Sequence, residues 1–302
     1  MSLLPLLLAA AVGAESLRLV PGETTRAVRV DGQRRAYLVY VPHRTHEDRP
    51  FPLVFVFHGF GADAPKMTRF CGMNDKAEEA GFVAVYPYGA GVGVIRVFNA
   101  GGLQGHLAGA MPDDVAFVRR ILEDLQGSGR IDPRRVYATG LSMGAMMCYR
   151  LAAELSDRIA AIAAVAGTMP PGLPRPRRPV PVVHFHGTAD DVVPLGGLRS
   201  GAADLLDFLS VDATVTFWAR ANRCSAVPQD SYLPDRFDDG TRVARRAYST
   251  AEQDTRVVLY VIEGGGHTWP GRTPPPIILG RSTREISAND LIWEFFQRHP
   301  LP

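Results

Sequence analysis

Short runs of apolar residues recur along the chain, and most of them are continuous in Val, Ile, Ala and Phe. They lack the alternation of apolar and polar positions that is typical of strands with one face in water. Continuous runs of this length are typical of strands buried on both faces, as in a parallel sheet covered by helices. The pattern predicts strands at residues 36–41, 53–57, 82–86, 135–139, 159–165, 180–185 and 257–262.

Segments with a helical period lie between these runs. They predict helices at residues 73–80, 113–125, 143–155, 211–221 and 287–298. The Asp113-Asp114 pair suits the positive end of one helix dipole, and Ser287 and Asp290 are placed as a capping pair in the last helix. The alternation predicts one α/β domain over residues 15–302, with a doubly wound, mostly parallel sheet and helices on both faces.

Three stretches interrupt this alternation with polar or proline-rich sequence, at residues 168–179, 223–241 and 271–286. Loops of this kind often shape the rim of a site on an α/β scaffold. We therefore expect them on the surface, around the functional residues.

Composition places few demands on partners. The 302 residues are 46% hydrophobic and 21% charged, which is ordinary for a globular protein. A net charge of +2 gives no reason to expect nucleic acid as a partner. Beyond the first residues no segment approaches a membrane span, so we expect no stable membrane insertion. The oligomeric state is left open.

Residues 1–14 have the apolar core of a signal peptide. The run is too short to span a bilayer, and Val12-Gly13-Ala14 offers small residues for cleavage before Glu15. No Lys or Arg precedes the run, which departs from the usual pattern. A misplaced start codon or a buried N-terminal segment are the alternatives. The segment predicts a secreted or periplasmic protein.

Motifs for metals and cofactors are missing from the sequence. It has no CxxC pair, no lysine-bearing P-loop and no GxGxxG, so we expect neither a metal nor a nucleotide cofactor. His184 and His186 are spaced like a metal pair but lack a further ligand at suitable spacing. Cys148 falls on a predicted helix as a small core residue, while pairing of Cys71 with Cys224 stays open.

The most informative stretch is Gly140-Leu141-Ser142-Met143-Gly144, between a predicted strand and a predicted helix. A serine flanked by glycines in this position describes a nucleophile elbow, a turn tight enough to require glycine on both sides. It lifts the serine hydroxyl above the edge of the sheet. The alternative is a glycine-rich turn with an incidental serine.

A nucleophilic serine needs a base and an orienting acid, each in a loop after a strand, because strand ends converge on one rim. Asp190 follows the strand at 180–185 and is the candidate acid, with Asp191 as its rival. His267 follows the last strand and three glycines, and it is the candidate base. The glycines let the backbone run close to another element and bring the ring over the serine.

The oxyanion hole should combine the amide after the nucleophile with an amide from the loop after an early strand. Met143 supplies the first amide. His58-Gly59-Phe60-Gly61 follows the strand at 53–57 and supplies the second, through Phe60. An ordinary glycine-rich strand exit is the alternative.

Several of these motifs together resemble the polyhydroxybutyrate depolymerase and feruloyl esterase-like family of secreted serine esterases. They are GLSMGAMM at 140–147, HGTAD at 186–190 and GGGHTWPG at 264–271, with FNAG at 98–101 and DDV at 113–115. The resemblance covers roughly residues 35–300, and HTWPG is its most specific part. It implies an α/β-hydrolase fold, a catalytic triad of Ser142, Asp190 and His267, and an ester substrate.

Aromatic residues near these motifs are candidates for binding substrate. Phe60, Phe98 and Trp269 are candidates for an apolar acyl or aromatic pocket, with core packing as the alternative, and Asn99 is a further substrate-binding candidate. Phe98 stands where the family usually has tryptophan. The region around residue 249 lacks the cysteine that often pairs with the one matching Cys224, which puts the family's usual disulfide in doubt.

The motifs predict a serine esterase that works through an acyl-enzyme, with a polyhydroxybutyrate depolymerase-like activity as the first hypothesis. A feruloyl or acetyl esterase acting on plant polysaccharide esters is the alternative within the class. The short chain disfavours a peptidase of the prolyl-oligopeptidase type. A non-catalytic binding protein on a hydrolase scaffold would have lost a triad member, whereas all three are present. The natural ester stays open.

Overall fold

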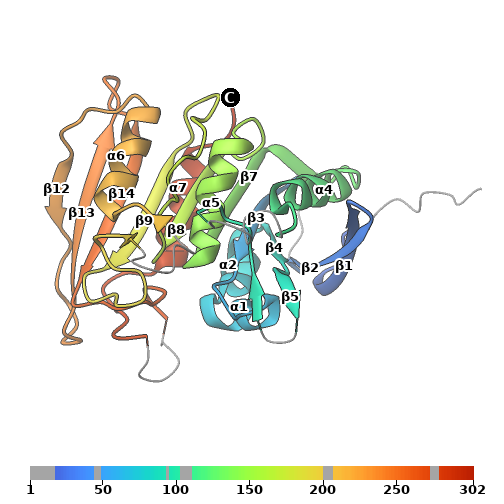
Figure 1. Ribbon diagram of the computed structural model, residues 1–302, viewed down its shortest axis with the longest axis horizontal. Helices are drawn as coiled ribbons and strands as arrows, with labels where there is room; N and C mark the ends of the chain where they lie inside the picture. The colour runs from blue at the N-terminus through green and yellow to red at the C-terminus, as the bar shows by residue number, and fades with distance from the viewer. Residues whose placement is uncertain (1–17, 44–48, 93–94, 103–110, 200–206, 273–278) are drawn as a thin grey trace, which may run out of the picture.

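A computed structural model describes residues 18–43, 49–92, 95–102, 111–199, 207–272 and 279–302. Within them, ten strands form one sheet in the order β1-β2-β4-β3-β7-β8-β9-β14-β13-β12 (Figure 1). The strands are β1 (Gly22–Val30), β2 (Gln33–Val41), β3 (Phe51–Phe57), β4 (Val83–Pro87), β7 (Ile131–Leu141), β8 (Ala161–Val165), β9 (Val182–Gly187), β12 (Gln229–Tyr232), β13 (Arg242–Ser249) and β14 (Thr255–Glu263). Residues 1–14, interpreted above as a signal peptide, lie outside the described part.

The middle of the sheet is parallel and its edges are antiparallel. Strands β4, β3, β7, β8, β9 and β14 pair in parallel with their neighbours in that order. The pairs β1-β2, β2-β4, β14-β13 and β13-β12 run antiparallel. Every residue of β3, β4, β8 and β9 is buried, as the continuous apolar runs predicted. The parallel strands therefore direct their carboxyl ends to one edge.

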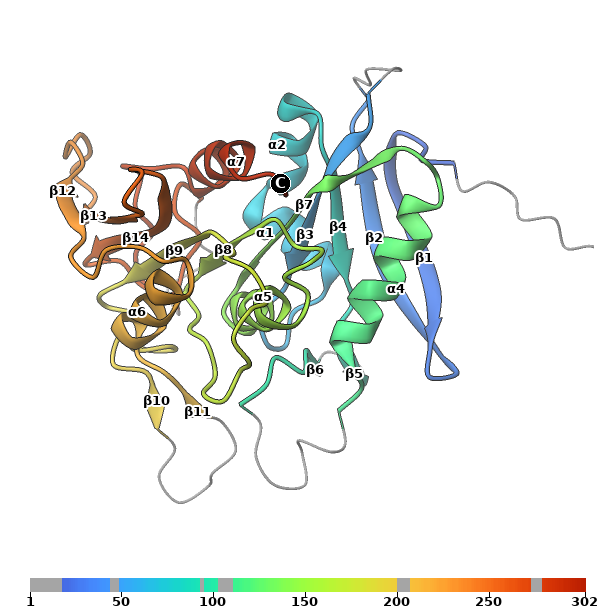
Figure 2. The same cartoon turned by 90° about the horizontal axis from the view of Figure 1, so that it is seen from above.

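Helices cover both faces of the sheet. Figure 2 shows α4 (Asp114–Gln126), α5 (Met143–Glu154) and α6 (Val211–Ala221) on one face, and α1 (Ala64–Cys71), α2 (Met73–Ala80) and α7 (Ala288–Arg298) on the other. Successive residues of a strand point to opposite faces of the sheet. Phe55 therefore packs into the core under α4, α5 and α6, and Val54 packs into the core under α1, α2 and α7. The predicted doubly wound, mostly parallel α/β architecture is confirmed.

Side-chain caps fix the starts of α4 and α7. The Asp113 carboxylate accepts hydrogen bonds from the Val115 and Ala116 N–H groups, and the Ser287 hydroxyl accepts one from the Asp290 N–H at 3.3 Å. The capping prediction for the last helix is confirmed. Such caps satisfy amides that have no partner inside the helix.

Several elements were not predicted, and they share polar or short sequences. The edge strands β1 and β12, and β13 next to the edge, carry exposed polar positions, so they lack the continuous apolar runs of the central strands. Strand β12 falls inside the stretch at 223–241, which was wrongly predicted as loop throughout. The sequence pattern also missed helix α1 and two small hairpins, β5 (Ala90–Val92) with β6 (Ile95–Val97) and β10 (Leu198–Arg199) with β11 (Asp207–Phe208).

The pairing of Cys71 with Cys224, which the sequence left open, is absent from the structure. Cys71 and Cys148 are buried and unpaired, and Cys224 is half-buried and unpaired. Cys148 lies in α5 and packs in the core, as expected from its position. None of the described helices combines the length and hydrophobicity that a bilayer crossing requires.

Candidate active site

Ser142 occupies the turn between β7 and α5 in a backbone conformation that side chains rarely adopt. Its φ is 58° and its ψ is −122°. The Ser142 N–H donates to the Val165 carbonyl at 2.9 Å, and its own carbonyl accepts from the Met146 N–H at 3.0 Å. Strand β8 and helix α5 thus hold the strained turn from both sides. The hydroxyl makes no capping bond to the helix, so it is available for chemistry.

The glycines beside Ser142 are required by close backbone contacts. A Cβ at Gly144 would lie 2.2 Å from the Phe57 carbonyl oxygen, a distance that no side chain tolerates. Helix α5 therefore starts directly against the end of β3. This contact places the nucleophile turn beside the loop that follows β3.

Asp190 and His267 meet at the ends of β9 and β14. The His267 Nδ1 atom lies 2.8 Å from the Asp190 Oδ2 atom, and both side chains are buried. The other carboxylate oxygen of Asp190 accepts hydrogen bonds from the Val192 and Val193 N–H groups at 3.0 and 2.8 Å. A carboxylate oxygen only accepts, so the hydrogen of the His267–Asp190 bond comes from the imidazole. His267 therefore carries its proton on Nδ1 and leaves Nε2 as an acceptor.

A second close backbone contact brings the acid and the base together. A Cβ at Gly187 would lie 2.2 Å from the Gly265 carbonyl oxygen, so the ends of β9 and β14 touch without side chains between them. Gly265 O also accepts from the Ala189 N–H at 2.8 Å. The glycines before His267 run close to other segments: a Cβ would lie 2.6 Å from the Gly240 carbonyl oxygen at Gly264 and 2.2 Å from the Leu279 carbonyl oxygen at Gly266. The close backbone approach expected for them from the sequence is therefore present.

Ser142 and His267 open onto the same cavity, which has a volume of about 930 Å³. Its wall combines apolar side chains with three cations. The lining residues are Gly59, Phe60, Ala62, Lys66, Met67, Arg69, Phe70, Leu141, Ser142, Val192, His267, Gly271, Arg272 and Leu279. A volume of this size suits a small organic ligand.

Two backbone amides beside Ser142 have no hydrogen-bond partner among the described residues. They are the N–H groups of Phe60 and Met143. Met143 is the first residue of α5, where amides lack an intrahelical acceptor. Gly59 brings the other amide close, since a Cβ at this position would lie 3.4 Å from Ser142 Cβ. These are the two amides predicted for an oxyanion hole.

His58 fixes the peptide between Gly59 and Phe60. Its Nδ1 atom lies 2.8 Å from the Gly59 carbonyl oxygen, and its Nε2 atom accepts from the Gly89 N–H at 3.0 Å. A carbonyl only accepts, so Nδ1 carries the proton. Burial lowers the pKa of His58 to about 4, which keeps the ring neutral. Because the peptide is planar and trans, holding the Gly59 carbonyl directs the Phe60 N–H the opposite way.

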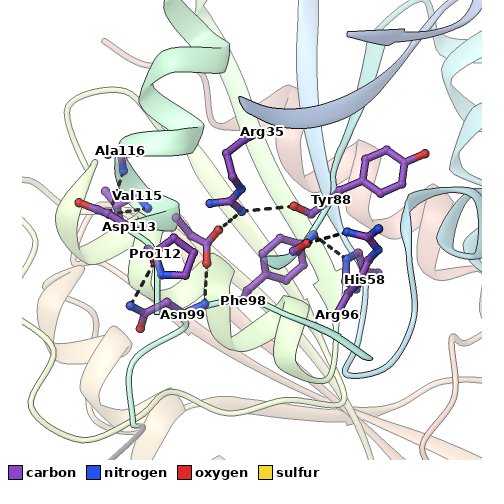
Figure 3. Close-up of polar contacts among 12 residues, drawn as sticks. Arg35, His58, Tyr88, Arg96, Phe98, Asn99, Pro112, Asp113, Val115 and Ala116 are labelled. Carbon is purple, nitrogen blue, oxygen red and sulfur yellow. Dashed lines mark hydrogen bonds and ion pairs between the residues drawn. The ribbon is translucent and has the colours of Figure 1, made fainter. Parts of the chain in front are cut away.

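A buried ion pair near His58 fixes the segment that carries Phe98 (Figure 3). Arg35 of β2 donates to the buried Asp114 carboxylate at 2.6 Å, and the second Asp114 oxygen accepts from the Asn99 N–H at 2.6 Å. Burial raises the pKa of Asp114 even with this arginine beside it. The neighbouring Phe98 ring packs on the His58 ring with centroids 4.5 Å apart. The ion pair therefore anchors the segment that backs the imidazole.

A chain of buried hydrogen bonds ties α5 to the loop of Asp190. The Tyr149 hydroxyl lies 2.5 Å from His184 Nδ1, His184 Nε2 lies 3.0 Å from His186 Nδ1, and His186 Nε2 lies 2.7 Å from the Val193 carbonyl oxygen. The carbonyl accepts, so each group in turn donates toward it, starting from the tyrosine. Burial lowers the pKa of both histidines.

This network accounts for the two histidines that the sequence spaced like a metal pair. All four ring nitrogens of His184 and His186 are engaged in hydrogen bonds within the protein. In the described part of the chain, no group of three His, Cys, Asp or Glu side chains is arranged to hold a metal ion.

The remaining candidates do not reach the cavity wall. Phe98 is buried against Phe57 and His58, and the Trp269 indole is buried and donates to Asn289. Asn99 Nδ2 donates to a backbone carbonyl at 3.4 Å. Core packing, which was the alternative for the aromatic candidates, therefore describes Phe98 and Trp269.

Sequence reasoning missed the residues that support the site. His58 was noted only as part of a glycine-rich motif, and Asp114 only as a helix-start charge. Arg35 and Tyr149 were not singled out. The available signal was a polar residue inside or next to an apolar run, because a buried polar group must find a partner.

The fold and site define the class of the protein. A mostly parallel sheet with helices on both faces carries a strained serine at a strand-to-helix turn, with an Asp–His pair after two later strands. These features together are those of the α/β hydrolases.

The chain belongs to the esterase family of this class. The Phospholipase/Carboxylesterase family model matches residues 109–217. A protein named as an esterase, NocK of Nocardia uniformis subsp. tsuyamanensis, is 35% identical over 285 residues, which cover 90% of this chain and 82% of the relative. Feruloyl esterase D of Neurospora crassa is 27% identical, covering 98% of this chain and 94% of the relative.

Solved structures share the fold. An acetyl xylan esterase from Aspergillus awamori has a TM-score of 0.58 and 15% identity, covering 91% of this chain and 99% of that chain. The family and its relatives identify the chain as a carboxylic ester hydrolase, with esters as substrates.

The buried neutral histidines generate a pH prediction. The pKa of His58 is about 4 in the folded protein, against an ordinary value of 6.5. Between these two pH values His58 is therefore protonated in the unfolded chain and neutral in the folded protein. Stability therefore falls as the pH falls. From pH 7 to pH 5 we expect His58 alone to lower the free energy of unfolding by about 2 kcal/mol, in urea titrations. An equal pH dependence in His58→Asn would contradict this assignment.

Proposed function

We propose that the chain is a serine esterase in which Ser142 is the nucleophile, His267 the base and Asp190 the orienting acid. The observation that carries the proposal is the 2.8 Å hydrogen bond from His267 to Asp190 at the wall of the cavity that also holds Ser142. Because His267 donates its Nδ1 hydrogen to the Asp190 carboxylate, Nε2 is left to take the proton of an attacking hydroxyl.

The serine hydroxyl forms no hydrogen bond with His267 among the described residues. Catalytic hydrogen bonds are often long without substrate and tighten in the Michaelis complex. Ser142 and His267 line the same cavity, so we expect this hydrogen bond to form when substrate binds.

The reaction follows from these roles. Ser142 Oγ attacks the ester carbonyl as His267 Nε2 takes its proton, and the carbonyl oxygen becomes an oxyanion. The imidazolium then gives this proton to the leaving alcohol, and an acyl-enzyme remains. Water repeats the attack with His267 as base, which releases the acid and restores the serine.

The amides of Phe60 and Met143 are the proposed oxyanion donors. Both lack partners among the described residues and both lie next to Ser142. Donors that are fixed before the reaction stabilise charge without reorganisation, and removal of one typically costs about 10²–10³ in kcat. On this proposal, His58 is a positioning residue.

The acyl group proposed for this site is apolar. Phe60, Met67, Phe70 and Leu279 supply apolar wall to the cavity. The feruloyl esterase among the relatives favours an aromatic acyl group, whereas the sequence motifs favoured hydroxyalkanoate oligomers as the first hypothesis. Methyl ferulate and a hydroxybutyrate oligomer, compared by kcat/KM, separate the two.

Ser142→Ala should lower kcat for p-nitrophenyl butyrate by about three orders of magnitude or more, because the nucleophile is removed. A fluorophosphonate probe should label the parent protein on Ser142, as read by peptide mass. Ser225→Ala, at an exposed serine, should keep full activity. Retained turnover or labelling elsewhere would overturn the assignment.

Asp190→Asn should lower kcat by roughly 10²–10⁴, because an amide can no longer stabilise the imidazolium and favours the wrong tautomer. Asp191→Asn is the matched control, since its side chain is exposed and should leave kcat within about twofold. A larger loss in Asp191→Asn than in Asp190→Asn would reverse the choice of acid.

His58→Gln should lower kcat about 10- to 100-fold with a small change in KM, because an oxyanion donor acts on the transition state. His58→Asn places an amide near the original Nδ1 and should recover much of kcat. Equal loss in both variants, with unchanged unfolding, would argue against positioning through the Gly59 carbonyl.

A further inference from the structure

The cavity wall carries positive charge without negative charge. Lys66, Arg69 and Arg272 line it, and among the residues that the structure describes, no Asp or Glu does. The whole chain is nearly balanced, with 33 basic and 31 acidic residues, so this local excess is not inherited from the composition.

Two of these cations have no ionic partner. Among the described residues, neither Lys66 nor Arg69 forms an ion pair, and both are exposed to the cavity and solvent. The nearest acid along the chain, Asp63, is engaged as the cap of α1 and accepts from the Lys66 N–H at 2.8 Å. Asp75 approaches Arg272 only at 3.9 Å, and its side chain is 85% exposed.

The three cations lie together at helix α1, two on the helix and one against its C-terminal end. Lys66 and Arg69 are three residues apart on α1 and therefore share a face, where like charges repel. The Arg272 guanidinium lies against Gly72 at the end of the same helix, and its Nη2 atom is 3.5 Å from the Arg69 carbonyl oxygen. Arg272 comes five residues after His267, so α1 and the loop of the base meet at this charge cluster.

From this cluster we infer that the preferred substrates are esters that carry a carboxylate, which Lys66, Arg69 and Arg272 attract while Ser142 attacks the ester carbonyl. The inference rests on the proposed function of Ser142. Esters formed through the hydroxyl of a hydroxy acid have this chemistry, because their alcohol part keeps a free carboxylate. Half-esters of dicarboxylic acids carry the free carboxylate on the acyl part instead.

The size of the cavity agrees with such a ligand. A sphere of about 930 Å³ would be about 12 Å across, close to the distance of about 10 Å over which charges act at 0.1 M salt. The ester and the carboxylate of one short substrate can therefore occupy the cavity together. The apolar wall from Met67 and Phe70 then packs on the carbon chain between them.

The test compares esters that differ by one charge. On the alcohol side, O-butyryl-3-hydroxybutyrate is compared with its N,N-dimethylamide. On the acyl side, mono-p-nitrophenyl adipate is compared with the diester in which its free carboxylate is methylated. Release of p-nitrophenol is the readout for this second pair. We expect kcat/KM to favour the charged member of at least one pair about 5- to 20-fold at low salt, and to lose most of this ratio in 0.5 M NaCl.

The charge variants locate the effect. Lys66→Gln combined with Arg69→Gln should bring the ratio to about one or two, because the charged member of each pair loses its attraction and the neutral member has none to lose. Arg119→Gln, an exposed arginine on α4, is the matched control and should keep the ratio. If the double variant does not fold, the salt dependence of the parent protein decides.

Two failures are distinguishable. Ratios near one for both pairs, with turnover that depends on Ser142, overturn the carboxylate inference and leave the esterase mechanism standing. Turnover of either pair that survives Ser142→Ala overturns the proposed function itself. A ratio that persists in the double variant places the charge recognition elsewhere and also overturns the inference.

Discussion

Contact between bare backbones is the constraint on which the site depends. At Gly187 and Gly265, two strand ends touch with no side chain between them, and at Gly144 a helix start touches the end of β3. Parallel strands bring their carboxyl ends to one edge, but side chains would keep the following loops several ångströms apart. The glycines remove that spacing. An acid, a base and a strained serine from three distant parts of the chain can then share one edge of the sheet.

Buried polar groups hold this arrangement more firmly than surface contacts could. The Arg35–Asp114 pair, the imidazole of His58 and the Tyr149–His184–His186 chain are enclosed, and each has defined partners. A buried polar group that loses its partner is costly, so each bond also selects one conformation of the loop that it touches. The Gly59–Phe60 peptide and the loop of Asp190 are thus oriented by buried groups that are not among the described residues lining the cavity.

The sequence was sufficient for the architecture and for the meeting of Asp190 with His267, and insufficient for the buried groups that support the site. Strands such as β3 and β9 are buried on both faces, and burial leaves a continuous apolar run that can be read directly. Edge strands such as β1 are held by antiparallel pairing with polar positions exposed, so no such run marks them. The Asp190–His267 contact could be anticipated because each follows a strand. The Arg35–Asp114 pair joins residues 79 positions apart through packing alone, and no local pattern encodes it.

The hydrogen-bond chain from Tyr149 has a mechanical consequence. Tyr149 stands on the helix that begins at the nucleophile, and the far end of the chain is the Val193 carbonyl in the turn that presents Asp190. Ser142 and Asp190 are therefore held in one connected frame. The glycines before His267 belong to the same frame, because the Gly265 carbonyl oxygen accepts from the Ala189 N–H and the Gly266 N–H donates to the Arg281 carbonyl. On the proposed mechanism, the approach of the Ser142 hydroxyl to His267 would fall to rotation of their side chains, with the backbone as the fixed reference.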